Sequence, residues 1–138
     1  MQISTKSRYG LRAMVELALN YGDGPVSLGE IAERQDISLK YLEQIVPHLK
    51  TAGFIRSVRG AGGGYSLRKN PKEITSLQIL QAIEGPLAPV DCVDSPNVCD
   101  RGKICATREL WVGMAETLRE YLETQTLDQL ARKQEKVR

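Results

Sequence analysis

Three cysteines are the residues of this 138-residue chain whose type and spacing could do metal or redox chemistry. Cys92, Cys99 and Cys105 follow the spacing C-x6-C-x5-C, in a segment that lacks helical or strand periodicity. Thiolates are soft ligands for iron-sulfur clusters, zinc and copper(I), and an irregular loop can wrap them around a compact cofactor. Because the number is odd and all three lie in one short segment, a structural disulfide framework is not expected.

The spacing leaves several interpretations of these thiols open. Zinc knuckles normally hold two cysteines within C-x2–4-C, which this segment lacks, so an iron-sulfur cluster fits the wide spacing better. Arg101 and Lys103 lie among the cysteines and could offset the negative charge of thiolates and a cluster. The same cations would lower the pKa of a thiol in a direct redox sensor. Free structural thiols are the third interpretation.

A second kind of chemistry, hydrogen bonding to DNA, is indicated by residues 27–51. Ser27 and Glu30 have the spacing of a capping box and predict a helix over 27–35, followed by a turn at 36–38. Ser38 is a good N-cap for a second helix. That helix has an inward apolar stripe, formed by Leu39, Leu42, Ile45, Val46 and Leu49. The outward side chains near its start are of the kind that read base edges in a major groove, namely Ser38, Lys40, Tyr41, Glu43 and Gln44.

The next segment, residues 54–69, predicts a β-hairpin with a glycine-rich tip. Residues that favour strands stand on both sides of a run with four glycines in five positions, 60–64. Basic side chains flank that run, which suggests contact with phosphates or a narrow minor groove. They are Arg56, Arg59, Arg68 and Lys69. A nucleotide-binding phosphate loop is disfavoured, because no Lys-Ser or Lys-Thr pair closes the run and no helix follows it.

The remaining pattern predicts the elements that position these two sites. A helix over 4–21 would form the back wall of the DNA-binding unit, and another over 75–85 would close it. Residues 86–105 are expected to form a long irregular loop, and such loops are uncommon in compact domains unless they have a function. We therefore expect a winged helix-turn-helix domain over 1–85 and a cysteine-bearing cluster loop over 86–105.

Residues 106–138 are expected to hold a dimerisation helix and a short helix after it. An apolar seam recurs at helical spacing through Trp111, Met114, Leu118 and Tyr121. The seam resembles that of a coiled coil, and a second copy of the chain is the expected partner, giving a homodimer. The predicted fold class is thus mainly α, with a small β-hairpin wing and a long C-terminal dimerisation helix.

The charge distribution agrees with this arrangement. The chain has a net charge of +2, but residues 1–70 hold ten Lys and Arg against six Asp and Glu, whereas residues 71–138 hold nine against eleven. The basic half contains the helix-turn-helix. No apolar run approaches the roughly 20 residues of a membrane helix and no signal peptide opens the chain, so we expect a cytoplasmic protein without membrane contact. No base-nucleophile pair or paired carboxylates indicate an enzyme.

Several of these motifs together resemble the IscR/NsrR/CymR-type family of bacterial winged-helix transcription regulators. They are Ile3-Ser4-Thr5-Lys6, Tyr41-Leu42-Glu43-Gln44, the run VRGAGGGY over 58–65, the three cysteines and Leu110-Trp111. The wing and the cysteines look like the IscR branch, which regulates iron-sulfur cluster assembly genes. The resemblance implies a homodimer on a pseudo-palindromic double-stranded DNA operator, with a [2Fe-2S] cluster on each subunit. It also implies that Lys40, Glu43 and Gln44 lie at the DNA and that Arg59 reaches the minor groove.

One position departs from that pattern. IscR-type proteins of the best-known kind have a histidine three residues after the third cysteine, where this chain has Arg108. Arginine stays protonated and cannot bind a metal. The candidates for a fourth ligand, from either subunit, are Asp91, Asp94, Asp100, Glu109, Glu43 and His48. A [4Fe-4S] cluster and nitric oxide sensing therefore stay open.

A metal-free regulator is the further alternative. In that case the cysteines would form a reversible disulfide, or the protein would regulate cysteine metabolism with a partner enzyme, as resemblance to the CymR branch implies.

Overall fold

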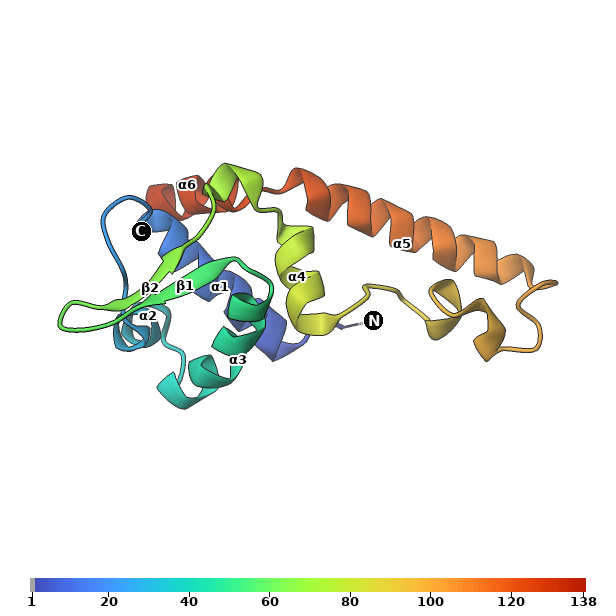
Figure 1. Cartoon of the computed structure of the whole chain (residues 1–138). Helices are drawn as coiled ribbons and strands as arrows, with labels where there is room; N and C mark the ends of the chain where they lie inside the picture. Colours follow the sequence, from blue (N-terminus) through green and yellow to red (C-terminus); the bar gives the residue numbers. More distant parts are fainter. Residues whose placement is uncertain (1) are drawn as a thin grey trace.

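In the computed structural model, which describes residues 2–138, a head and an arm can be distinguished (Figure 1). The head contains α1 (Thr5–Leu19), α2 (Leu28–Gln35), α3 (Leu39–Thr51), β1 (Ile55–Val58), β2 (Gly64–Leu67), α4 (Ser76–Glu84) and α6 (Leu127–Val137). The arm consists of α5 (Ala106–Thr124) and the cysteine loop, residues 86–105. Short 3-10 turns interrupt the chain at Pro71–Glu73, Asp91–Val93 and Pro96–Val98. The expectation of a mostly helical fold with a hairpin wing is confirmed.

The core of the head is built around α1, against which α3, α4 and α6 pack. Apolar residues at helical spacing bring one face of each helix inward, and the largest of these side chains are fully buried. They include Met14, Leu42, Ile45, Ile79 and Leu127. Burying a side chain of this size removes it from water at a gain of about 1.5–3 kcal/mol. This core fixes the position of α3, whose outer face stays exposed.

Local signals set the helix boundaries of the helix-turn-helix. Ser27 and Glu30 form the predicted capping box at the start of α2, because each side chain bonds to the backbone N–H of the other. Asp36 takes a left-handed conformation with φ of 51°, which ends α2. Ser38 then caps α3 by accepting a hydrogen bond from the backbone N–H of Tyr41 at 3.0 Å. The two predicted N-caps are therefore confirmed.

The wing is a two-stranded antiparallel hairpin attached to the start of α2. Its register pairs Ile55 with Leu67, both buried against the head, and Val58 with Gly64 near the turn. Val26, just before α2, forms an isolated bridge with Tyr65 through backbone hydrogen bonds of 2.9 and 2.8 Å. This bridge ties the wing to the helix-turn-helix.

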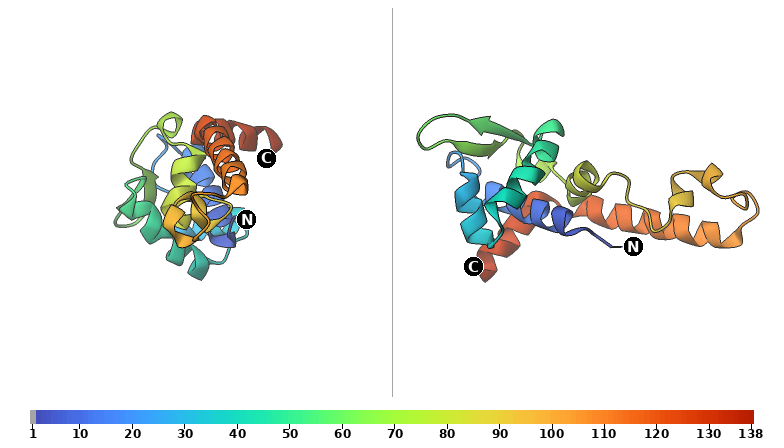
Figure 2. Two further views of the ribbon diagram at one scale, coloured as in Figure 1. Left: turned by 90° about the vertical axis from the view of Figure 1, so that its right-hand side faces the viewer. Right: turned by 90° about the horizontal axis from the view of Figure 1, so that it is seen from below.

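The arm leaves the head at α4 and returns to it through α6 (Figure 2). The cysteine loop lies beside the first part of α5, and the turn at Asp91–Val93 contacts that helix. At the far end of α5 the carbonyl of Gln125 accepts hydrogen bonds from the backbone N–H and the hydroxyl of Ser76, both at 2.8 Å. From there α6 runs back along α1. No helix within residues 2–138 is long and apolar enough to cross a bilayer.

Candidate nucleic-acid interface and cysteine loop

The outer face of α3 carries the side chains that the sequence predicted for base reading. Lys40, Glu43 and Gln44 are exposed near the start of the helix. The fourth, Tyr41, is half-buried and packs edge-on against Tyr9 of α1, with ring centroids 5.6 Å apart. Only part of the Tyr41 side chain is therefore available to a ligand.

Ser38, the fifth of these residues, is exposed but already has a structural task. Its side-chain oxygen accepts the hydrogen bond that caps α3. The hydroxyl proton remains free to donate, because only the oxygen lone pair is used in the cap. The N-terminus of α3, which this cap begins, carries the partial positive charge that favours an anion such as a phosphate.

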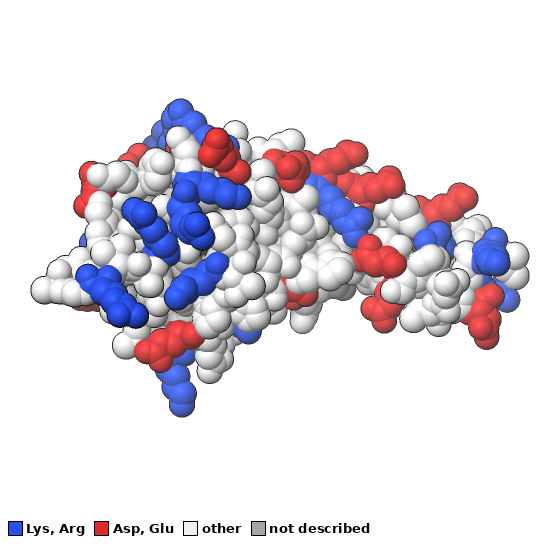
Figure 3. Space-filling model, in the orientation of Figure 1, with Lys and Arg blue, Asp and Glu red and all other residues white. Residues whose placement is uncertain are grey.

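The wing contributes a cluster of positive charge beside α3. Arg56 and Arg59 are exposed on and next to β1, and Arg68 and Lys69 are exposed after β2. Within residues 2–138 none of these four side chains forms an ion pair. Figure 3 shows Lys and Arg side chains gathered on the head, over the wing, whereas acidic side chains are numerous along the arm. Such an unneutralised basic surface favours binding of a polyanion.

The three cysteines lie on the loop where the sequence placed them, and all are free thiols. Cys92 is half-buried within the turn at Asp91–Val93, Cys99 is exposed, and Cys105 is the N-cap residue of α5. Among residues 2–138 no three His, Cys, Asp or Glu side chains gather closely enough to hold a metal ion. In this conformation the donor set therefore does not fit a cluster.

The Cys105 thiol has a distinctive environment. Its sulfur lies 3.1 Å from the hydroxyl oxygen of Thr107. This contact is the main reason that the pKa of the Cys105 thiol lies below its ordinary value, and the backbone N–H of Arg108 contributes after it. Partial burial opposes the shift, and the positive charge of Arg101 adds slightly to it. The thiolate is the nucleophilic form, so this site favours thiol chemistry.

Two arginines of α5 fasten the cysteine loop to the helix. Arg108 donates from Nε to the carbonyl of Cys92 at 3.0 Å, and its Nη2 lies 3.5 Å from the carbonyl of Val93. Arg119 donates to the carbonyl of Leu87 at 3.1 Å and pairs with Asp94 at 2.9 Å. From the sequence, Arg108 was notable only because it stands where the best-known IscR-type proteins have a histidine ligand. The structure shows that its guanidinium holds the backbone around the first cysteine.

The candidates for a fourth ligand are distributed over both parts of the molecule. Asp94 is engaged by Arg119, whereas Asp91, Asp100 and Glu109 are exposed on the arm. Glu109 and Cys105 share a shallow cavity of about 450 Å³ with Arg108 and Lys103. Glu43 and His48 belong to α3 on the head, where Nε2 of His48 lies 2.9 Å from Nζ of Lys6. None of these candidates meets the three sulfurs within the described residues.

Helix α5 also has an apolar stripe without a partner in the described chain. Leu110, Met114 and Tyr121 are 62%, 46% and 61% exposed. Trp111 and Leu118, which the sequence placed in the same seam, are half-buried. Within the seam that the sequence predicts, Met114 and Tyr121 are thus the most exposed side chains.

Sequence reasoning also missed one buried polar residue. Glu16 of α1 is fully buried and is contacted by residues of α2 and by Arg138. Its signal was a carboxylate in the middle of the apolar run AMVELAL, residues 13–19.

Comparison with known proteins shows which protein family the chain matches. The family model Rrf2, described as iron-dependent transcriptional regulator, matches residues 3–133. The transcriptional regulator CymR of Bacillus subtilis is 44% identical over 131 residues, which span 95% of this chain and 90% of CymR. The regulator IscR of Pectobacterium atrosepticum is 38% identical over 135 residues, spanning 98% of this chain and 82% of IscR.

Solved structures agree with these matches. The structure of B. subtilis CymR (YrzC), named the global cysteine regulator, superimposes with a TM-score of 0.84 at 43% identity and covers 96% of this chain and 97% of that chain. T. potens IscR gives a TM-score of 0.81 at 37% identity, over 100% and 91% of the two chains. These relatives are named as regulators, which confirms the expectation that the chain is not an enzyme. The chain belongs to the Rrf2 family of transcription regulators, the family of IscR and CymR.

Proposed function

We propose that the protein is a cytoplasmic homodimer that binds a pseudo-palindromic DNA operator and adjusts its affinity through the cysteine loop. The observation that carries this proposal is the joint presence of two surfaces on one chain. One is the exposed start of α3 beside a basic wing whose cations form no ion pair within residues 2–138, and the other is a thiol-bearing loop fastened to α5. In this arrangement α3 enters the major groove, and Arg59 of the wing reaches toward the minor groove.

The dimer is supported by the exposed stripe of α5. Leu110, Met114 and Tyr121 lie four and seven residues apart and present apolar surface to solvent, which a second copy of the same helix would cover. A twofold axis through the arms would place two α3 helices at symmetric half-sites, about 34 Å apart for adjacent turns of DNA. Because the cysteine loop is bonded to the same helix, a change in the loop alters the distance between the two α3 helices.

An iron-sulfur cluster on Cys92, Cys99 and Cys105 is the first candidate for the input signal. It is supported by the triad on one irregular loop and by the relatives named IscR, and by resemblance the target genes would be those of cluster assembly. A [2Fe-2S] cluster is the first choice and [4Fe-4S] the second. Binding either cluster requires the loop to rearrange, because the sulfurs do not gather in the present conformation. Because Arg108 and Arg119 hold the loop on α5 in the present conformation, these contacts would have to change when a cluster binds.

Direct thiol chemistry without a metal is the second candidate. It is favoured by the lowered pKa of Cys105 and by the similarity to a protein named the global cysteine regulator. Under this proposal hydrogen peroxide oxidises the Cys105 thiolate to a sulfenic acid with release of hydroxide, and a second cysteine thiol of the loop then forms a disulfide with it and releases water. The change at the N-terminus of α5 alters how the arm is placed relative to the head. Nitric oxide sensing would use the same loop.

One set of measurements on protein purified without air separates these inputs. Iron and sulfide contents and the visible spectrum are recorded for the wild type and for Cys92→Ala, Cys99→Ala and Cys105→Ala. A cluster predicts bound iron and a visible spectrum that each substitution removes. Thiol chemistry predicts metal-free protein whose DNA affinity changes with hydrogen peroxide, returns with dithiothreitol and becomes insensitive in Cys105→Ala. If all three variants bind DNA like the wild type under every condition, the loop is not the sensor.

A further inference from the structure

Glu16 of α1 is the only Asp, Glu, Lys or Arg among residues 2–138 that is buried. Its side chain has no exposed surface, and its neighbours Val15 and Leu17 are buried as well. Taking a carboxylate out of water costs several kcal/mol unless it is paired and hydrogen-bonded. The residues that surround Glu16 therefore determine whether this part of the core is stable.

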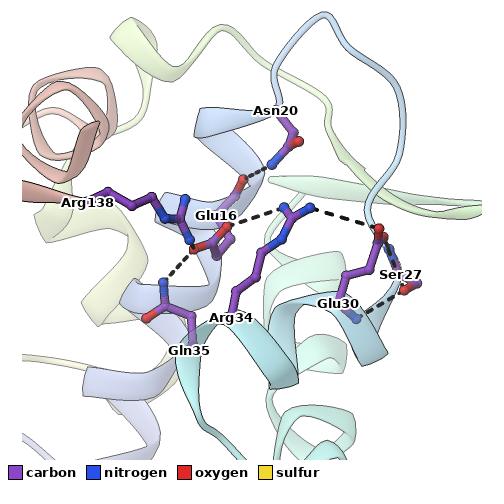
Figure 4. A network of polar contacts seen from close by, with 7 residues as sticks. All are labelled: Glu16, Asn20, Ser27, Glu30, Arg34, Gln35 and Arg138. Carbon is purple, nitrogen blue, oxygen red and sulfur yellow. Dashed lines mark hydrogen bonds and ion pairs between the residues drawn. The ribbon is translucent and has the colours of Figure 1, made fainter. Parts of the chain in front are cut away.

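Those partners come from two regions that are distant in sequence (Figure 4). The side-chain amide of Gln35 donates to Oε1 of Glu16 at 2.7 Å, and Nη1 of Arg34 lies 3.6 Å from Oε2. Both residues belong to the last turn of α2. The other partner is Arg138, which follows α6 and forms an ion pair with Oε1. One buried carboxylate thus joins α1, α2 and the end of α6.

Gln35 occupies the point where α2 ends and the turn into α3 begins. Besides donating to Glu16, its side-chain oxygen accepts a hydrogen bond from Nε of Arg12 at 2.9 Å, and its backbone carbonyl accepts one from Nη2 of Arg12. Asp36, the left-handed residue, follows directly. Fixing Gln35 therefore fixes where α3 starts relative to α1.

The charge balance of Glu16 depends on α6. Oε2 of Glu16 accepts no hydrogen bond within the described residues, and Arg34 faces it only at 3.6 Å while also lying 4.0 Å from Glu30. If α6 moved away from α1, Arg138 would leave, and the buried carboxylate would retain Gln35 and this distant guanidinium. Because α6 follows α5 directly after Gln125, a displacement of the arm would move α6 and, with it, Arg138.

We propose that Glu16 is a positioning residue for DNA recognition, which holds the α2–α3 turn through Gln35 and couples its position to the docking of α6 through Arg138. The proposal rests on the proposed function, because it assumes that α3 reads DNA. By this coupling, a displacement of the arm changes the position of α3 through α6 and Glu16. No contact between the cysteine loop and the head is required.

The experiment uses full-length protein and a duplex that the wild type selects from a random-sequence library. Glu16→Gln keeps the shape of the side chain and an acceptor for Gln35, but removes the negative charge. Glu135→Gln is its control, because Glu135 is an exposed residue of α6 that forms no ion pair with residues 2–138. Arg138→Gln removes the α6 partner, with exposed Lys136→Gln as control. The double variant of Glu16 and Arg138 completes a mutant cycle.

Affinities are measured by fluorescence anisotropy at 15 °C, with the folded fraction checked by circular dichroism. Glu16→Gln is expected to weaken binding of the selected duplex by about tenfold and of poly(dI-dC) by less than about twofold, since only α3 is displaced. Arg138→Gln is expected to weaken it about threefold, and the double variant to match Glu16→Gln, because both residues act through one carboxylate.

Several results would overturn the proposal. These are wild-type affinity in fully folded Glu16→Gln, equal losses on both DNAs, or single-variant effects that multiply in the double variant. If Glu16→Gln does not fold, Arg138→Gln and its control carry the test, and wild-type affinity in Arg138→Gln refutes the coupling. A wild-type protein that selects no duplex would instead refute the proposed DNA binding itself, which keeps the two failures distinct.

Discussion

Replacing Gly64 by alanine is expected to detach the wing from the start of α2. A β-carbon at this position would lie 2.3 Å from the carbonyl oxygen of Val26, 2.4 Å from its carbonyl carbon and 2.6 Å from the backbone nitrogen of Ser27. All three neighbours are backbone atoms, so rotation of a side chain cannot relieve the contact. The chain can accommodate the methyl group only by moving β2 away from Val26.

The cost follows from the contacts that this movement breaks. Val26 and Tyr65 exchange two backbone hydrogen bonds, of 2.9 and 2.8 Å, each with a net contribution of about 0.5–1.5 kcal/mol. The free energy of unfolding should therefore fall by about 1–3 kcal/mol beyond the strain of about 1 kcal/mol that the positive φ of this position imposes on alanine, and disturbance of the Ser27 cap would add up to about 1 kcal/mol. For a chain of this size a total loss of about 2–5 kcal/mol should lower the melting temperature by roughly 7–17 °C. DNA affinity should also decrease, because the basic wing is no longer held beside α3.

Gly22→Ala is the matched control for this experiment. Gly22 also has a positive φ, of 88°, but its β-carbon would have no neighbour within 4 Å among residues 2–138. This variant should lose about 1 kcal/mol from backbone strain alone and keep wild-type DNA affinity. Thermal unfolding and anisotropy titrations measure both quantities. Gly64→Ala with the stability and DNA affinity of Gly22→Ala would show that the Val26–Tyr65 bridge does not hold the wing in place.

Three further predictions concern the DNA surface and the cysteine loop. Arg59→Ala should weaken DNA binding by about 1–3 kcal/mol, and Gln44→Ala should mainly relax sequence choice; mobility-shift titrations showing wild-type behaviour for both would contradict the groove contacts. Arg108→Leu should release the cysteine loop from α5 and make its backbone more mobile, so limited proteolysis should cut within residues 91–105 several times faster than in the wild type; an unchanged rate would show that the hydrogen bonds of Arg108 do not hold the loop. Thr107→Val removes the hydrogen bond that chiefly lowers the pKa of Cys105, so the thiolate should form at higher pH. The pH profile of alkylation at that cysteine, followed by mass spectrometry, should shift upward accordingly, and an unshifted profile would refute the assigned cause.

The helix-turn-helix could be predicted from the sequence because its signals are local. The capping box at Ser27 and Glu30 and the N-cap at Ser38 each act within one helical turn, so neighbouring residues suffice to reveal them. The glycine-rich run similarly allows, at its own positions, the positive φ angles that a sharp turn requires. The family resemblance rests on the same kind of contiguous motif, and the comparisons confirm it.

The conformation of the cysteine loop and the partners of the buried carboxylate of Glu16 were decided only by the tertiary structure. The spacing of three cysteines names possible ligands, but it does not determine whether their sulfurs converge, and here the hydrogen bonds of Arg108 and Arg119 hold the loop in a shape where they do not. Glu16 could be seen in the sequence as a carboxylate in an apolar run, yet its partners Gln35 and Arg138 lie 19 and 122 residues away. Sequence periodicity reports which face of a helix turns inward. Which charged groups meet there is decided only when the packed helices bring distant residues together.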